Sequence, residues 1–349
     1  MIDFTRSTLS KFIIHFVGNK GLSEELTLSE KEVVIKDEFT KETLLRYLTS
    51  PFKTDIYYKF RKNEDVSKNQ IAEISDSLFT SDKDFIKKSQ IIAEHLYNQS
   101  THPKIQGGEL YVCYFKDLMV DGQLCDGIGC FKTENKETYL KVYQHVDSFE
   151  LDYDNGININ KLDKGALIYN IDSKKGYKLS VIDNNSRGPE CALYWEEDFL
   201  GSTLKESGYF YTKNFMDASR GFCEEVLTDQ NNVSKLDQMM MLNKATGYFK
   251  DKETFDIGDF EKNVLGQPEL INAFSEYRHE YADKYNAPIV EEFDVSPSAV
   301  KQNNKYMKSV VKLDKNFHIY IHGRHDFVER GYDDVKGLKY YKLYFENEI

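Results

Sequence analysis

Apolar residues near the N-terminus first follow the two-residue period of strands and then the longer period of helices. The pattern predicts strands over 12–17 and 32–35, connected through a Gly-Asn-Lys turn, and a helix over 40–50 that Pro51 ends. Two further helices are expected, each with one apolar stripe. Ser67 would cap the first, with Ile71, Ile74 and Leu78 on its stripe, and Asp82 the second, with Phe85, Ser89, Ile92 and Leu96 at helical spacing.

Between residues 107 and 183 the apolar period changes to two. Turn signals such as DGQ, DNG and KKG separate six short runs: GELYVCYF, CDGIGCF, TYLKVY, SFELDY, ALIYN and YKLSVI. This pattern predicts an antiparallel meander, and we expect the preceding helices to cover one face of its sheet. The fold class is therefore α+β.

Past Trp195 the pattern becomes helical again and then returns to strands. Helices are expected over 212–227, 234–249, 259–265 and 268–284. A chain of 349 residues is long enough for two domains. We place the boundary in the gap at 201–208, between an N-terminal α+β domain, 1–200, and a second part, 201–349, with a helical segment and a C-terminal β-hairpin.

The sequence KSVVKLDKNFHIYIHG, 308–323, permits a prediction of the hairpin's register. A three-residue loop, 314–316, pairs Leu313 with Phe317, and the other pairs follow. One face then carries the pairs Val311–Ile319 and Ser309–Ile321, and the other carries Lys312–His318, Val310–Tyr320 and Lys308–His322. We expect Val311, Leu313, Phe317, Ile319 and Ile321 to be buried together, and Lys308, Lys312 and His318 to be exposed.

Charge decides where nucleic acid could bind. The chain has a net charge of −12, which repels a polyanion at long range, so any contact with DNA must be local. Segment 301–324 has six basic residues and a single acid, Asp314. We therefore predict a DNA-binding face with phosphate contacts and a tyrosine that can stack on a base, made of Lys308, Lys312, Lys315, His318, Tyr320, His322 and Arg324. The alternative is a solvated sheet face on which lysines protect an edge.

Several other site types lack support in the sequence. The N-terminus has no signal-peptide pattern, no stretch approaches the ~20 apolar residues of a membrane helix, and the five cysteines are scattered without a CxxC pair. We expect a cytoplasmic protein with reduced thiols, Cys113 and Cys130 acting as core residues on neighbouring strands. The segment at 17–21 lacks the spacing of a phosphate-binding loop and is expected to be a plain turn.

Two segments of the sequence carry residue types that bind metals or catalyse reactions. His318 and His322 would lie ~13 Å apart on a strand and cannot share an ion, and His322 with His325 has no third ligand. The segment GIGCFKTENK suggests a metal-dependent nuclease, with Asp126, Glu134 and Glu109 as carboxylates and Lys136 beside them. The alternative for that segment is a hairpin turn. No established catalytic motif is present, so we expect neither an enzyme nor a cofactor.

The chain resembles the bacterial nucleoid-associated protein family over nearly its whole length, and more closely its longer branch. The segments that carry the resemblance are FVGNK (16–20), SPFK (50–53), HPKIQGGELYV (102–112), IGCFKTENK (128–136), GININKLDKGALIYN (156–170), YW with DFL (194–200), KLDKNFHIYIHG (312–323) and KYYKLYF (339–345). The resemblance implies a cytoplasmic protein that accompanies the chromosome and binds DNA, without a catalytic residue set.

Three functional hypotheses remain open at this point. The chain could be a DNA-binding module of the nucleoid, a metal-dependent nuclease, or an adaptor that reaches the nucleoid through protein partners.

Overall fold

The structure, a computed structural model, describes residues 2–347 except 53–55, 62–68, 185–193, 229–232, 234, 286, 305–309, 314–316 and 321–326. It divides into two compact units, 1–205 and 206–349. Helices and strands occur together in an α+β fold with a large antiparallel sheet, as the sequence predicted. Within the described ranges, no helix is long and apolar enough to cross a membrane.

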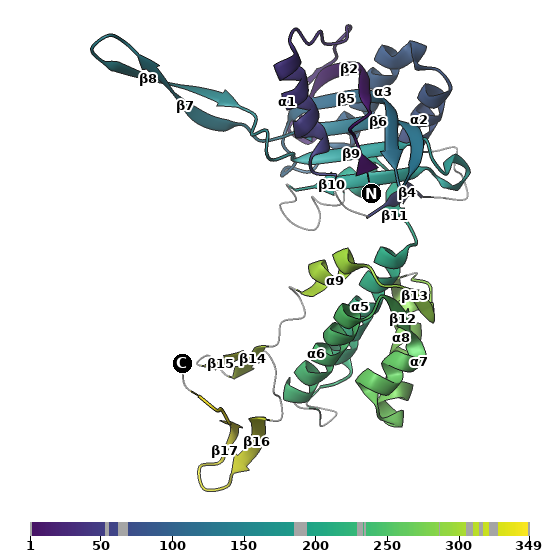
Figure 1. The fold of residues 1–349 in the computed structure, drawn as a ribbon, viewed down its shortest axis with the longest axis vertical. Helices are drawn as coiled ribbons and strands as arrows, with labels where there is room; N and C mark the ends of the chain where they lie inside the picture. Colours follow the sequence, from purple (N-terminus) through teal and green to yellow (C-terminus); the bar gives the residue numbers. More distant parts are fainter. Residues whose placement is uncertain are drawn as a thin grey trace. The chain divides into compact units, whose positions relative to one another are not determined.

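An antiparallel sheet of nine strands, counted over the described residues, is the framework of the first unit (Figure 1). The strand order is β11-β4-β10-β9-β6-β5-β2-β3, and β1 pairs with β5. The strands are β1 (Ile2–Asp3), β2 (Thr8–Val17), β3 (Leu26–Thr27), β4 (Tyr58–Phe60), β5 (Gly108–Val120), β6 (Gln123–Thr133), β9 (Lys164–Tyr169), β10 (Lys178–Asp183) and β11 (Ser202–Leu204).

Helices cover both faces of this sheet, whereas the sequence suggested one. Side chains alternate between the faces of a strand, so each face has an apolar core of its own. On one face α2 (Gln70–Thr80) and α3 (Phe85–Gln99) pack on residues such as Ile13 and Val112. On the other, α1 (Glu38–Thr49) packs on residues such as Tyr111 and Phe131. The expectation of helices on one face was wrong because the central strands of the sheet, β2, β5, β6 and β9, have apolar side chains on both faces.

The apolar stripes of the two predicted helices are confirmed, but their caps differ. Ile71, Ile74 and Leu78 of α2 are buried, as are Phe85, Ser89, Ile92 and Leu96 of α3. Asn69 caps α2, since its side chain accepts from the Ala72 N–H. Ser67 lies outside the described residues. Asp82 begins a short 3-10 turn, Asp82–Asp84, that precedes α3 and is not its cap.

Two strand predictions need correction. Residues 32–35 form no strand, because β3 takes the place beside the end of β2. The segment keeps a backbone hydrogen bond to β2, from the Val33 N–H to the Phe12 carbonyl at 2.9 Å. All six runs of the meander are strands, but β7 (Glu137–Gln144) and β8 (Phe149–Gly156) form a separate hairpin. β6 pairs directly with β9, so the chain leaves the sheet at 133 and returns at 164.

An aromatic core and four main helices make up the second unit as far as the structure describes it. They are α5 (Gly208–Glu225), α6 (Lys235–Asp251), α8 (Pro268–Tyr285) and α9 (Pro297–Asn304), with the short α7 (Ile257–Phe260) and a π-helical turn, Glu261–Leu265. Phe215 lies at the centre, with its ring 4.3 Å from that of Phe255 and 4.9 Å from that of Phe260. Helical periodicity predicted every one of these except α9, which has only eight residues.

Three two-stranded sheets complete the described part of this unit. They are β12 (Thr254–Asp256) with β13 (Glu292–Asp294), β14 (Val310–Leu313) with β15 (Phe317–Tyr320), and β16 (Val328–Asp333) with β17 (Leu338–Leu343).

The register of β14 and β15 is the predicted one. Leu313 pairs with Phe317 and Val311 with Ile319, while Lys312 pairs with His318 and Val310 with Tyr320. Ile319 and Leu313 are partly buried against Leu236 and Met239 of α6. Phe317 is 63% exposed, so its predicted burial was wrong: Leu313 and Ile319 belong to the cluster on α6, and Phe317 does not.

Candidate functional site

A row of polar side chains crosses the interior of the large sheet, on the face that α3 covers. Register partners connect His15 on β2 to Leu110, then to Lys132 on β6, Lys164 on β9 and Asp183 on β10. The two lysine side chains are 0% and 1% exposed. Directly opposed partners point to the same side of a sheet, so two ammonium groups are buried next to each other. Each therefore requires a counter-charge of its own.

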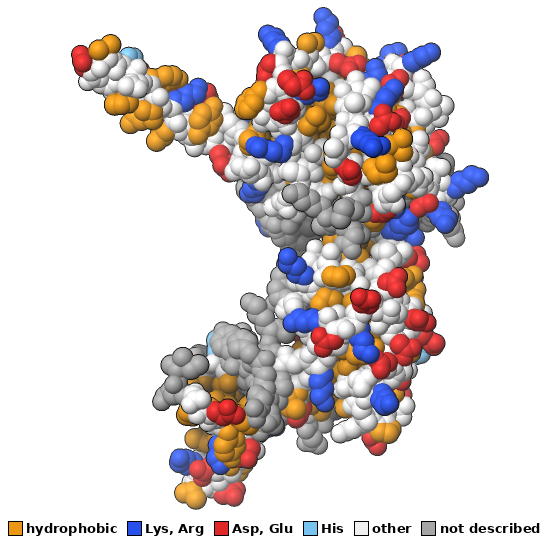
Figure 2. Space-filling model, in the orientation of Figure 1, with side chains coloured by type: hydrophobic (Ala, Val, Ile, Leu, Met, Phe, Trp, Pro, Cys, Tyr) orange, Lys and Arg blue, Asp and Glu red, His pale blue; other side chains and the backbone are white. Residues whose placement is uncertain are grey.

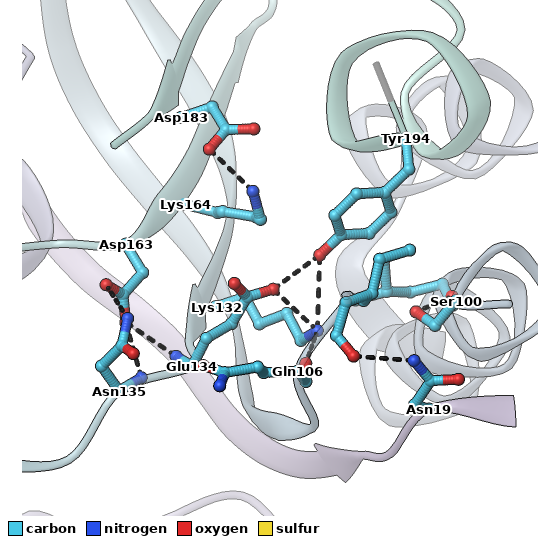
Figure 3. A network of polar contacts seen from close by, with 12 residues as sticks. Asn19, Ser100, Gln106, Lys132, Glu134, Asn135, Asp163, Lys164, Asp183 and Tyr194 are labelled. Atoms are coloured by element: carbon cyan, nitrogen blue, oxygen red, sulfur yellow. Dashed lines mark hydrogen bonds and ion pairs between the residues drawn. The ribbon is translucent and has the colours of Figure 1, made fainter. Parts of the chain in front are cut away.

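Lys132 has three oxygen partners (Figure 3). Its Nζ donates to the Gln106 carbonyl at 2.6 Å, to Glu134 Oε1 at 3.0 Å and to the Tyr194 hydroxyl at 3.4 Å. The Tyr194 hydroxyl in turn donates to Glu134 Oε1 at 2.7 Å. Burial lowers the pKa of Lys132, and the charge and hydrogen bond of Glu134 act against that shift.

Lys164 forms a second buried ion pair beside the first. Its Nζ donates to Asp183 Oδ1 at 2.7 Å, and it lies 5.0 Å from the centre of the Tyr194 ring. Tyr194 begins a π-helical turn, Tyr194–Phe199. The Tyr194 hydroxyl accepts from Lys132, and the Tyr194 ring faces Lys164. These contacts connect the turn to the end of β6 and the start of β9.

The turn after β6 is held by a buried carboxylate, Asp163. It accepts from the Glu134 N–H at 2.8 Å, the Asn135 N–H at 2.9 Å and the Asn135 side-chain amide at 2.9 Å. Asp163 therefore holds the backbone of Glu134 in place, and this positions the Glu134 carboxylate beside Lys132 (Figure 3).

Asn19 provides the corresponding support on the other side of Lys132. Its side-chain amide donates to the carbonyls of His102 at 2.8 Å and Ile105 at 2.7 Å, next to Gln106 (Figure 3). Its Oδ1 accepts from the Leu22 N–H and caps a 3-10 turn, Lys20–Leu22. The backbone amides of Asn19, Lys20 and Gly21 donate to Glu24 or to the Ser100 carbonyl. The prediction of a plain turn at 17–21 is confirmed, since these donors are occupied within the protein.

This network binds loops to the sheet rather than opening toward a ligand. The lysines are paired with carboxylates, and in the part of the chain that the structure describes no group of three or more His, Cys, Asp or Glu could hold a metal ion. Its chemical role is to fix the ends of three strands and the segments at 102–106 and 194–199.

Sequence reasoning missed this network, although a signal was present. Lys132 ends one apolar run, GIGCFK, and Lys164 begins another, KGALIY, and the alternation of each run places the lysine on an interior face. Five of the segments that carry the family resemblance supply its members: 16–20, 102–112, 128–136, 156–170 and 194–200. Segments far apart in the sequence thus meet at one place in the fold.

The four residues of the nuclease hypothesis do not assemble into one site, although two of them, Glu109 and Lys136, form an ion pair. Asp126 and Glu134 are eight residues apart on or just past the same strand, ~26 Å at ~3.3 Å per residue. The Tyr114 hydroxyl donates to Asp126, and Lys136 pairs with Glu109 at 2.6 Å on a partly exposed surface. The alternative for this segment, a hairpin turn, is not found either, because residues 134–136 connect β6 to β7 and these two strands do not pair.

The predicted DNA-binding residues are only partly described. Lys312 and His318 are partners on the hairpin face opposite Leu313 and Ile319, and His318 is exposed. Tyr320 is a register partner of Val310, with only its backbone described, as for Lys312. Lys308, Lys315, His322 and Arg324 lie outside the described residues, as do Ile321 and His325.

A family model described as nucleoid-associated protein YejK matches residues 13–336. The match covers most of the chain and includes both units. A search of curated proteins finds no match.

Proposed function

The chain belongs to the family of nucleoid-associated protein YejK, and on that premise we propose that it binds DNA directly, without catalysis, in the bacterial cytoplasm. The family places its members at the nucleoid. We assign the contact to the C-terminal hairpin, through Lys308, Lys312, Lys315, His318, Tyr320, His322 and Arg324.

The register of β14 and β15 is the observation that supports this assignment. One face of the hairpin packs on α6 through Leu313 and Ile319, so positions 312 and 318 belong to the opposite face, away from that contact. Phosphate contacts need cations that are free of a core. A face with Lys312 and His318 on it, separated from the packed face, meets that need.

Charge distribution supports the same region. Segment 301–324 has a local excess of five positive charges within a chain of net charge −12. Because the overall field repels DNA, binding should be modest in affinity and strongly dependent on salt. The absence of an assembled carboxylate set around Glu134, among the described residues, supports a binding function over a nuclease.

Reversal of three hairpin lysines tests the proposal. The variant Lys308→Glu, Lys312→Glu, Lys315→Glu is compared with Lys83→Glu, Lys87→Glu, Lys88→Glu, an equal change of charge at and near the start of α3 in the other unit. Binding of labelled duplex DNA is titrated at several salt concentrations. Each phosphate contact contributes about 0.9 to the log–log salt slope, so the hairpin variant should lose up to ~3 units of slope and most of its affinity.

The matched control removes the effect of net charge. If both triple variants bind DNA equally well, the hairpin assignment is wrong. If the unmodified protein does not bind DNA at low salt, an adaptor that reaches the nucleoid through protein contacts becomes the better account.

A further inference from the structure

The β7–β8 hairpin, residues 137–156, extends away from the large sheet as a two-stranded arm (Figure 1). Its pairing gives it two different faces. The pairs Tyr139–Asp154, Lys141–Asp152 and Tyr143–Glu150 form a polar face, and Leu140–Tyr153, Val142–Leu151 and Gln144–Phe149 form an apolar one.

The apolar face is uncovered. Its five large side chains, Leu140, Val142, Phe149, Leu151 and Tyr153, are between 62% and 71% exposed. Figure 2 shows hydrophobic side chains along most of the visible length of the arm. A continuous exposed apolar patch of this kind marks an interaction surface in a soluble protein.

An isolated two-stranded hairpin is at best marginally stable in water, and it becomes stable when a further layer covers its apolar face. The arm itself is well formed: strands of eight residues pair over their full length, Lys141 pairs with Asp154 at 2.6 Å, and the Tyr139 ring lies over Gly156. A covering layer from a partner would stabilise the arm in this form.

We propose that the apolar face of the arm binds the same face of a second copy of this chain. The placement of the acidic residues is compatible with this partner. The arm has five acids and one lysine, so its charge of −4 disfavours nucleic acid. Four of the acids, Glu137, Glu150, Asp152 and Asp154, belong to the polar face, so two apolar faces can meet without burying a carboxylate.

The area of the face is sufficient for such a dimer. Five large side chains that each expose on the order of 100–150 Å² present roughly 600 Å² per copy. Two copies would remove about 1,200 Å² from water, at the lower end of the ~1,200–2,000 Å² that specific interfaces bury.

An antiparallel arrangement of the two arms fits the order of the apolar pairs. Val142–Leu151 is the middle pair, so a two-fold axis through it brings the Leu140–Tyr153 pair of one copy onto Phe149 of the other. This arrangement separates the two acidic chains by about the length of an arm, ~26 Å for eight residues. That distance exceeds the ~8–10 Å screening length at physiological salt, so the charges outside the arms, −12 − (−4) = −8 on each chain, scarcely oppose association.

Adjacent positions on β7 provide a matched test in the full-length protein. Val142→Lys and Tyr143→Lys add the same charge one residue apart, at exposed side chains on opposite faces. The mass of the unmodified protein, measured by light scattering and sedimentation over micromolar concentrations, should approach twice 40.7 kDa. Val142→Lys brings two ammonium groups together at the axis and should raise the dissociation constant at least ~100-fold. Tyr143→Lys should leave the dimer intact.

Leu151→Lys, on the partner strand of the same pair, should repeat the effect of Val142→Lys. Far-UV circular dichroism confirms that the variants are folded. A monomer at tens of micromolar for the unmodified protein would overturn the proposal, as would a dimer that Val142→Lys and Tyr143→Lys weaken equally. The experiment does not involve DNA, so its result is independent of the proposed nucleoid function.

Discussion

His15 of β2 and Ser89 of α3 meet across the core, with His15 Nε2 3.0 Å from Ser89 Oγ. The Ser29 N–H donates to His15 Nδ1 at 3.0 Å, and the Ser89 hydroxyl donates to the Ile86 carbonyl at 2.7 Å. Nδ1 is therefore an acceptor and Nε2–H the donor, which specifies a neutral imidazole. Burial lowers the pKa of His15 to about 4.

This histidine should make the first unit sensitive to acid. A histidine with a folded-state pKa of about 4 and an unfolded value near 6.5 binds more protons when the protein is unfolded. Stability is therefore complete above pH 6.5 and falls as the pH drops toward 4. The loss between pH 7 and pH 5 is on the order of 2 kcal/mol from this group. Urea unfolding at the two pH values measures it.

The comparison is with His15→Gln, which cannot take up a proton in this range. This variant should lose less stability between pH 7 and pH 5 than the unmodified protein does. An identical loss of stability in both proteins would contradict the assignment of the acid sensitivity to His15. Burial also lowers the pKa of His95, but His95 is present in both proteins, so its contribution cancels.

Lys132 and Lys136 both pair with a glutamate, and their replacement should have very different effects. Lys132→Met leaves the Glu134 carboxylate, which is 3% exposed, without its buried cation. Loss of one partner of a buried pair costs about 3–5 kcal/mol. Lys136→Met removes a pair at the surface and should cost less than ~1 kcal/mol. Denaturant unfolding measures the free energy of unfolding of the two variants. Equal losses of stability would show that the buried network contributes little.

Leu313 and Phe317 are register partners with different surroundings. Leu313 packs against α6, so Leu313→Ala should destabilise the hairpin by roughly 1–2 kcal/mol, less than a fully buried leucine. Phe317→Ala should cost under ~1 kcal/mol because the ring is exposed. Hydrogen exchange of the β14 and β15 amides reports the local effect. A greater loss from Phe317→Ala would mean that the ring has a partner in solution.

The cysteines should be unreactive in the folded protein. Cys113 and Cys130 lie on the neighbouring strands β5 and β6, completely buried, as predicted. Burial raises the pKa of Cys130 and of Cys223 to about 12 and that of Cys125 to about 11. An aromatic disulfide reagent at pH 8 should therefore leave Cys113, Cys125, Cys130 and Cys223 unmodified, since the thiolate is the reactive form; Cys191 lies outside the described residues. Unfolded protein prepared under alkylating, non-reducing conditions should yield five free thiols; fewer would contradict a reducing compartment.

Local patterns along the sequence determined much of the fold. The stripes Ile71–Ile74–Leu78 and Phe85–Ser89–Ile92–Leu96 specify α2 and α3, because a helix places residues three and four apart on one side. The register of β14 with β15 follows from a short loop and two contrasting faces, which a shift by one residue would mix. These features depend on neighbours in the sequence, so the sequence by itself is sufficient to predict them.

Other features depend on contacts between distant segments, and only the tertiary structure decided them. The runs at 137–144 and 149–156 have the same alternation as the strands of the large sheet, but β6 pairs with β9 and the arm is left outside. Lys132 is an unremarkable strand residue in the sequence until Glu134, Tyr194 and the Gln106 carbonyl surround it. Alternation determines which face a side chain occupies, whereas the choice of neighbouring strand and of counter-charge follows from the packing of the whole unit.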